Sequence, residues 1–338
     1  MWSDWNLATM SPYLHGTVGT ARLPSAARGA KAGQAFRRRL GEATLPRDFI
    51  RVCRALLFLV VIALSSYLCR AQVSASPHPG TNGAAPAGPA DQPAPRTDAN
   101  SQAAHLQLLD KAGKGGIDVY FAGDSITRRW GTSDPQYKDN LANWTANFFG
   151  WNAADFGWGG DLIQNILWRL ENGELDGVNP RIIVLLAGIN NVGAVPPDEA
   201  KIADITRGLK AILDLCRKKA PAATIILTAI FPRNDNLGVI PGINRINANL
   251  AQLADGKTVR YLNVNDKLAD ENGRLFEGMM NPGDKLHPTV KGYQVWADGL
   301  KPIFTEILGP PAKTDHAPSP TGDPSASRSA GRPFPAEQ

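Results

Sequence analysis

The stretch Phe121–Gly131, FAGDSITRRWG, interrupts an apolar run with Gly-Asp-Ser. The residues before it, 117–120 (IDVY), are typical of a buried strand. A glycine permits a tight turn where a strand ends. The serine that follows, Ser125, either caps the next helix or is held out for chemistry. The rest of the sequence has to decide between these two interpretations.

Short apolar segments alternate with longer amphipathic ones through the middle of the chain. The expected strands are 118–122, 153–156, 181–187, 224–231 and 260–264. The expected helices are 137–149, 162–171, 198–219, 243–253 and 291–308. This alternation predicts an α/β domain with a parallel sheet covered on both faces, in which sites form at the carboxyl ends of strands. Ser125 falls at such an end.

The two ends of the chain differ from this middle part. Residues 76–100 and 309–338 are rich in Pro, Ala and Gly and show no apolar period. Such composition predicts a disordered linker and a disordered tail. The folded domain is therefore expected over residues 101–308, a length that suits one domain.

The basic residues of the chain are concentrated in its first part. Residues 1–75 carry ten Lys or Arg and three Asp or Glu, a net charge of +7. The whole chain carries +5, so the remainder sums to −2. A nucleic-acid-binding domain needs basic residues clustered on its folded part, so we expect no nucleic-acid partner.

The leader contains an apolar segment, 55–68 (ALLFLVVIALSSYL), preceded by Arg47, Arg51 and Arg54. The segment is short for a bilayer span of about 20 residues and suits the apolar core of a signal peptide. Small residues at 73–75 offer a cleavage site. We expect an exported protein, secreted or periplasmic. A retained leader would instead anchor it in a membrane, the one membrane contact expected.

Cysteine usage argues against several kinds of site. Cys53 and Cys69 flank the apolar segment of the leader, which leaves Cys216 alone in the expected domain. One thiol without a Cys-x-x-Cys motif favours neither structural zinc nor redox chemistry. Cys216 lies in a helical apolar pattern and is expected in the core.

Three further polar stretches fall at expected strand ends or before the last helix: 156–161 (FGWGGD), 188–191 (GINN) and 284–288 (DKLHP). Each has an ordinary explanation as a turn, a loop or a surface pair. Together with Ser125 they contain what acyl transfer needs, namely a nucleophile, a base, a group to orient the base and donors for an oxyanion.

The residue types allow one assignment of these roles. Ser125 supplies the hydroxyl. The expected domain holds two histidines, and His105 precedes the first strand in a helix-like segment, so His287 is the better base. Asp284, three residues earlier, is close enough to hold the imidazole and to stabilise its protonated form.

The oxyanion donors would be the backbone N–H groups of Ser125 and Gly160 and the side-chain amide of Asn190. Gly160 would let a substrate approach the backbone without a Cβ in the way. Trp130, Trp158 and Asn191 flank these stretches and are candidates for the substrate pocket. That the two tryptophans belong to the core or its rim is as good an interpretation.

The four stretches resemble the four sequence blocks of the SGNH (GDSL-type) hydrolases, in the same order across 118–308. Residues 156–177 are similar to the catalytic subunits of the intracellular platelet-activating-factor acetylhydrolases. The resemblance implies a flavodoxin-like three-layer sandwich with a five-stranded parallel sheet, and no metal or cofactor. It also implies the same catalytic and oxyanion residues: Ser125, Asp284, His287, Gly160 and Asn190.

The expected function is that of an exported serine esterase that hydrolyses short-chain, above all acetyl, esters through an acyl-enzyme. The domain is close to a minimal core without a long lid, which favours short acyl groups. Export favours acetylated glycans, although a small-molecule ester remains open. Two alternatives are a carbohydrate O-acyltransferase and a non-catalytic glycan-binding module. The presence of every candidate catalytic residue disfavours the binding module.

Overall fold

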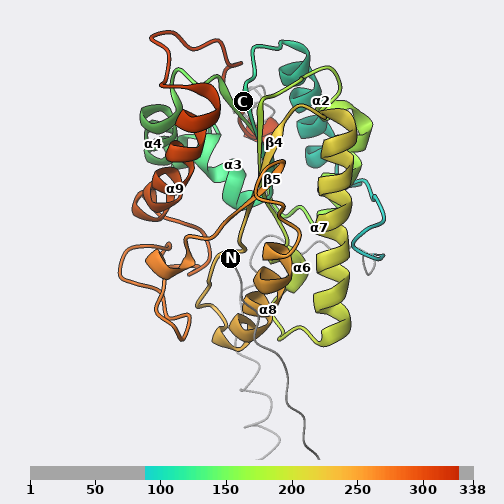
Figure 1. The fold of residues 1–338 in the computed structure, drawn as a ribbon, viewed down its shortest axis with the longest axis vertical. Helices are drawn as coiled ribbons and strands as arrows, with labels where there is room; N and C mark the ends of the chain where they lie inside the picture. The colour runs from blue at the N-terminus through green and yellow to red at the C-terminus, as the bar shows by residue number, and fades with distance from the viewer. Residues whose placement is uncertain (1–87, 327–338) are drawn as a thin grey trace, which may run out of the picture. The chain divides into compact units, whose positions relative to one another are not determined.

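The computed structural model describes residues 88–326 (Figure 1). Five parallel strands form one sheet in the order β2-β1-β3-β4-β5, which confirms the expected sheet. The strands are β1 (Val119–Gly123), β2 (Ala153–Gly157), β3 (Ile182–Leu186), β4 (Thr224–Thr228) and β5 (Val259–Leu262). Every residue of β1, β2 and β3 is buried, as the continuous apolar runs predict for strands covered on both faces.

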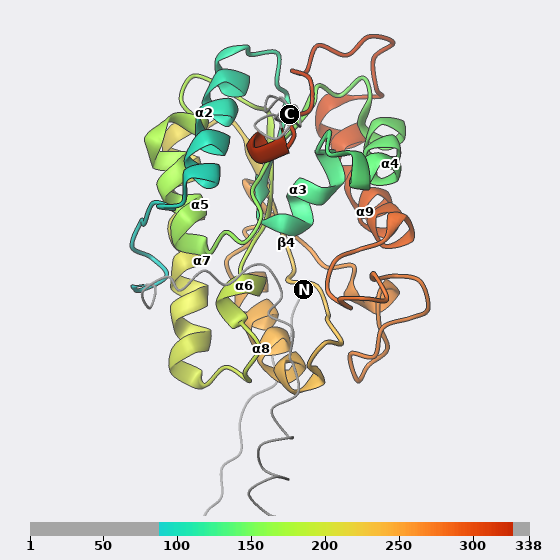
Figure 2. The same cartoon turned by 180° about the vertical axis from the view of Figure 1, so that it is seen from behind.

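Helices cover the two faces of the sheet as separate layers (Figures 1 and 2). One layer holds α3 (Ser125–Gly131), α4 (Lys138–Phe148) and α9 (Val290–Leu308). The other holds α2 (Ala99–Gly113), α5 (Ile163–Arg169), α7 (Glu199–Lys219) and α8 (Ile240–Ala251). Short elements complete the set: η1 (Pro135–Tyr137), η2 (Leu170–Glu174), α6 (Ile189–Val192), η3 (Leu237–Val239) and η4 (Asn265–Lys267).

The strand order places a topological switch point beside β1. Because β1 lies between β2 and β3, the connection from β1 to β2 and the connection from β2 to β3 run over opposite faces of the sheet. Ligands of open α/β sheets bind at such a switch point, outside the carboxyl ends of the strands. Gly123 ends β1 there, directly before the Asp-Ser pair.

One strand is shorter than its apolar sequence predicts. We expected it to continue to Phe231, but β4 ends at Thr228 although residues 229–231 are buried. The side chain of Asn247 on α8 replaces the ladder there, since it bonds both the N–H and the carbonyl of Ile230 at 2.8 Å. Satisfying these buried polar groups lets the chain leave the sheet toward the site.

The folded part extends beyond 101–308 at both ends, so the expected disorder is wrong for residues 88–100 and 309–326. Ala90 is fully buried, and its N–H donates to Asp204 at 3.0 Å. The tail pairs with the domain through Ala312 N–H to Gly150 O, 2.9 Å. Composition predicted disorder because it does not show which backbone groups find partners on the domain.

Other expectations fall partly outside the described residues. The leader with its apolar segment 55–68 lies outside them, as do residues 76–87 of the expected linker and 327–338 of the expected tail. Between residues 88 and 326, no helix is long and apolar enough to cross a membrane. Cys216 is fully buried on α7, which confirms its expected place in the core.

Candidate active site

Ser125 is the first residue of α3, and the capping role belongs to its neighbour. The Asp124 carboxylate accepts the N–H of Ile126 at 2.9 Å, so the Ser125 hydroxyl is not needed as a cap. A Cβ at Gly123 would lie 2.0 Å from Thr127 Oγ1 and 2.6 Å from Leu186 O, so a larger residue does not fit there. The chain therefore turns sharply at residues 123–125, and the Ser125 hydroxyl is available for a partner other than the helix backbone.

A continuous hydrogen-bonded chain leads away from that hydroxyl. Ser125 Oγ lies 2.8 Å from His287 Nε2, and His287 Nδ1 lies 2.9 Å from Asp284 Oδ2. Asp284 Oδ1 also accepts the backbone N–H groups of Leu286 and His287, both at 3.0 Å. The structure thus brings together the three residues that the sequence singled out as nucleophile, base and orienting acid.

The histidine lies in the long connection 263–289 between β5 and α9. Backbone bonds hold this segment: Asn281 N–H donates to His287 O at 2.8 Å, and Asn234 N–H donates to Lys285 O at 2.9 Å. Lys285 has a φ of +53°, which closes the turn between the acid and the base. The imidazole is therefore fixed although it belongs to no helix or strand.

Burial and neighbouring charges set the protonation of the pair. Burial opposes ionisation of Asp284, but hydrogen bonds from the ring and backbone of His287 outweigh it and hold its pKa below the usual value. Burial lowers the pKa of His287, and the positive charges of Arg129 and Arg233 lower it further against the opposing effect of Asp284. The imidazole is therefore neutral at neutral pH, as a general base must be.

Sequence reasoning missed Arg129, which contacts the triad. Its guanidinium donates to Asp284 Oδ2 at 3.2 Å and lies 5.3 Å from the ring centre of Tyr137. Arg129 follows Ser125 by four residues on α3, so both side chains emerge on one side of the helix. The sequence signal for Arg129 was its position four residues after Ser125 in the segment 125–130 (SITRRW).

We expect the rate of ester hydrolysis to fall at acid pH with a midpoint below about 6.5, the ordinary imidazole pKa, because only neutral His287 accepts a proton. Arg129→Gln removes a positive charge that lowers the pKa of His287, so the midpoint should move to higher pH. A kcat/KM profile from pH 4 to 9 measures it. Arg245→Gln, at an exposed ion pair with Glu199, is the control. An unchanged or lower midpoint in Arg129→Gln would contradict this account.

Three groups remain the candidate oxyanion donors: the N–H groups of Ser125 and Gly160 and the side-chain amide of Asn190. Gly160 is exposed with a φ of +77°. Asn190 Nδ2 donates one hydrogen to Asp161 O at 2.8 Å, which leaves its second hydrogen available. The N–H groups of Ser125 and Gly160 have no acceptor among residues 88–326. Within the same residues, no group of three or more His, Cys, Asp or Glu is placed to hold a metal ion.

Trp130 does not line a substrate pocket, which corrects that expectation. Its side chain is fully buried and stacks on Tyr293 and Trp296, with ring centres 4.8 and 5.0 Å away. Its indole N–H donates to Asn143 Oδ1 at 2.9 Å. The aromatic ring points into the layer between the sheet, α4 and α9, so the alternative interpretation as a core residue holds.

Asn191 and Trp158, the other two candidates for the substrate pocket, contact other parts of the protein. Asn191 is buried, its side-chain Oδ1 accepts Ile163 N–H at 2.9 Å, and its Nδ2 donates to Gln164 Oε1 at 2.9 Å. Trp158 is 7% exposed and lines a cavity of about 290 Å³. The Trp158 indole N–H donates to Ser101 Oγ at 2.8 Å, and none of the triad residues lines that cavity, so the Trp158 side chain is directed toward α2.

Residues 121–295, more than half of the chain, match the family model described as GDSL-like Lipase/Acylhydrolase family. The chain belongs to this family. It is 28% identical over 242 residues to platelet-activating factor acetylhydrolase IB subunit alpha1 of Bos taurus, covering 70% of this chain and 97% of that protein. The alpha2 subunit of Homo sapiens is 30% identical over 196 residues, covering 56% of this chain and 77% of that protein.

One solved structure agrees on the fold. A proposed acylhydrolase from Bacteroides fragilis superposes with a TM-score of 0.50 at 19% identity, over 63% of this chain and 100% of that one. Family membership and the acetylhydrolase relatives identify this GDSL-like protein as a carboxylic ester hydrolase.

Proposed function

We propose that this GDSL-like hydrolase cleaves short-chain, above all acetyl, esters through an acyl-enzyme on Ser125. The observation that carries the proposal is the hydrogen-bonded chain from Ser125 through His287 to Asp284. Gly160 and Asn190, which follow the ends of β2 and β3, are the proposed oxyanion donors. A nucleophile, a base, an orienting acid and oxyanion donors together make up the apparatus of acyl transfer.

The geometry leads to two half-reactions. In the first, Ser125 Oγ attacks the ester carbonyl carbon while His287 Nε2 takes its proton, and the N–H groups of Ser125 and Gly160 and the Asn190 amide stabilise the oxyanion. His287 then returns the proton to the departing alkoxide as the ester C–O bond breaks. In the second, His287 takes a proton from water, whose oxygen attacks the acyl carbon; His287 then returns this proton to Ser125 Oγ as the acyl C–Oγ bond breaks and the acid leaves. Asp284 stabilises the imidazolium in both.

Two observations support a short acyl group. The chain spans 97% of the bovine relative, whose name is that of an acetylhydrolase. Cavities of about 240, 290 and 530 Å³ occur in the described part of the chain, and none of them is lined by Ser125, His287 or Asn190. These spaces are therefore not acyl-chain tunnels that open at the nucleophile.

The proposed setting is outside the cytoplasm, with acetylated glycans as the substrate class. Its support is the apolar segment 55–68 after a basic stretch, a pattern typical of export. Polysaccharides with O-acetyl groups are esters that an exported enzyme meets. A transferase that uses the same acyl-enzyme, with a sugar hydroxyl in place of water, is a distinguishable outcome of the test.

The test measures hydrolysis of p-nitrophenyl acetate, butyrate and octanoate by the full chain. We expect kcat/KM to fall at least about 10-fold from acetate to octanoate, because the short-acyl site that we propose would exclude the added methylenes. Acetate release from acetylated xylo-oligosaccharides then tests the glycan class. Preference for octanoate would contradict the short-acyl proposal, and acetyl transfer to an added sugar without hydrolysis would favour the transferase.

A further inference from the structure

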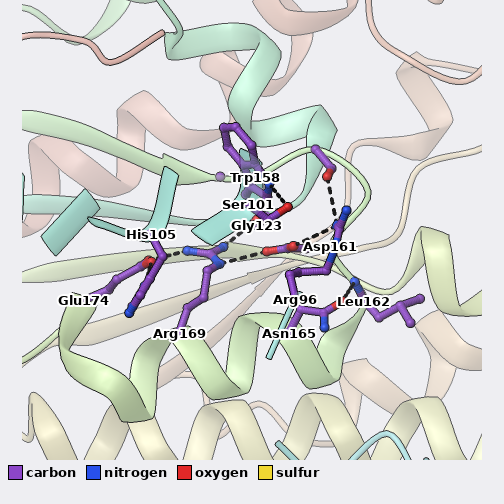
Figure 3. Close-up of polar contacts among 12 residues, drawn as sticks. Arg96, Ser101, His105, Gly123, Trp158, Asp161, Leu162, Asn165, Arg169 and Glu174 are labelled. Atoms are coloured by element: carbon purple, nitrogen blue, oxygen red, sulfur yellow. Dashed lines mark hydrogen bonds and ion pairs between the residues drawn. The ribbon is translucent and has the colours of Figure 1, made fainter. Parts of the chain in front are cut away.

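A buried cluster of charged side chains includes Asp161, the residue that directly follows Gly160 (Figure 3). We use "buried cluster" for Asp161, Arg169 and Glu174, of which no residue is more than 5% exposed. Arg169 Nε donates to Asp161 Oδ2 at 2.8 Å, and its Nη1 forms an ion pair with Glu174. The second oxygen of Glu174 lies 2.7 Å from His105 Nδ1. Each charge in the cluster therefore has a partner.

The buried cluster is linked to the Asn190 amide and to the segment that carries Ser125, two parts of the proposed oxyanion hole. Asp161 directly follows Gly160, and its backbone carbonyl accepts the Asn190 amide at 2.8 Å. Arg169 Nη2 donates to the carbonyl of Gly123, two residues before Ser125, at 3.4 Å. One set of bonds therefore links the Gly160 turn, the Asn190 amide and the segment that carries the nucleophile.

Arg96 holds the same turn from its other side. Its Nη1 donates to Gly159 O at 3.2 Å and lies 3.5 Å from Asp161 Oδ1. A Cβ at position 160 would lie 3.3 Å from this nitrogen, and Gly160 already has a φ that disfavours other residues. The peptide group that carries the Gly160 N–H is thereby held at its carbonyl oxygen, Gly159 O.

Stability alone does not account for this arrangement. Charges removed from water carry a desolvation cost, and apolar residues of similar volume would often serve a core as well. Burial raises the pKa of Asp161 to about 6, although Arg169 opposes this, so the folded protein maintains a carboxylate at some cost. The charged groups contribute precise positioning, because charge-assisted hydrogen bonds have a defined geometry and hold the atoms of the turn in place.

We propose that Asp161, held by Arg169, is a positioning residue for ester hydrolysis: it fixes the turn that presents the Gly160 N–H and the Asn190 amide to the oxyanion. The inference rests on the proposed function of these donors. Asp161 touches no reacting atom and acts through Gly160 and Asn190. An oxyanion donor displaced by about 1 Å loses much of its effect, because the interaction strengthens only in the transition state.

The test compares Asp161→Asn with wild type at pH 8, where the Asp161 carboxylate is ionised. We expect kcat for p-nitrophenyl acetate to fall about 10- to 100-fold with KM within about 3-fold. Affinity for methylboronic acid, which forms a tetrahedral adduct with the serine hydroxyl, should fall by a similar factor. A merely structural residue would lower the melting temperature and leave both quantities unchanged in the folded enzyme.

Asp134→Asn is the matched control, because Asp134 is a buried carboxylate paired with Arg128 that itself bonds no atom of residues 159–161. It should retain wild-type kcat. If Asp161→Asn does not fold, Arg96→Gln decides, since this partly exposed side chain holds the same turn. It should lower kcat about 3- to 10-fold without loss of fold. Unchanged kcat in the folded variant, or a change confined to KM, overturns the inference. An inactive wild type would instead overturn the proposed function.

Discussion

Replacing Ser125 with alanine is expected to lower kcat for p-nitrophenyl acetate by at least about 10⁴-fold. The hydroxyl forms the covalent bond to the acyl group, and the 2.8 Å contact to His287 is its route for proton release. The cap of α3 is provided by Asp124, so the helix should begin normally in the variant. Steady-state kinetics and a melting curve measure both quantities.

Two further variants make the Ser125 test specific. Ser133→Ala removes an exposed hydroxyl outside the site and should leave kcat unchanged. Adding His287→Ala to Ser125→Ala should cost little more, because the two residues act as one unit. If Ser125→Ala keeps activity within about 10-fold of wild type, another residue is the nucleophile and the acyl-enzyme proposal is wrong.

The parts of the site that sequence located are those defined by scarce residue types. Two histidines in the expected domain left His287 as the better base, and an acid three residues away followed directly. The parallel sheet also followed from local pattern, because strands buried on both faces are continuously apolar. Local sequence was therefore sufficient where a rare residue type identified a site residue or where a hydrophobic pattern identified a strand.

Predictions were wrong where a residue's role depends on the direction of its side chain. Trp130 follows Ser125 by five residues, and on α3 this offset turns it toward the core. Asn191 neighbours Asn190, yet its amide is used by α5. Adjacent residues of a helix face different ways, so nearness in sequence to a catalytic group does not place a side chain in its pocket.

Other features were hidden because they depend on contacts between distant segments. Arg96 falls in the expected linker but contacts Gly159, 63 residues further along the chain. Arg169 lies in α5, whose sequence pattern gives no reason to expect a buried arginine. Its partner Asp161 belongs to the segment before α5, and only the folded structure shows that the two side chains meet. Burial of a charge is set by its partners in space.

The second large effect is expected from Asp284→Asn, which should lower kcat by about 10⁴-fold with little change in fold. Asp284 Oδ1 accepts two backbone N–H groups, so the carbonyl oxygen of an asparagine should take this place. The amide nitrogen would then face His287 Nδ1 and donate to it. That bond forces the imidazole proton onto Nε2, where it blocks acceptance of the Ser125 proton.

Asp255→Asn is the matched control, because Asp255 likewise accepts backbone N–H groups, those of residues 257–259, in the turn before β5. This turn lies at the amino end of β5, away from the site, so kcat should stay at the wild-type value. The readout is kcat on p-nitrophenyl acetate together with melting temperature. A loss of less than about 10-fold in folded Asp284→Asn would mean that Ser125 and His287 act as a dyad. In that case the main role of Asp284 would be to close the turn that places His287, since its backbone bonds survive the substitution.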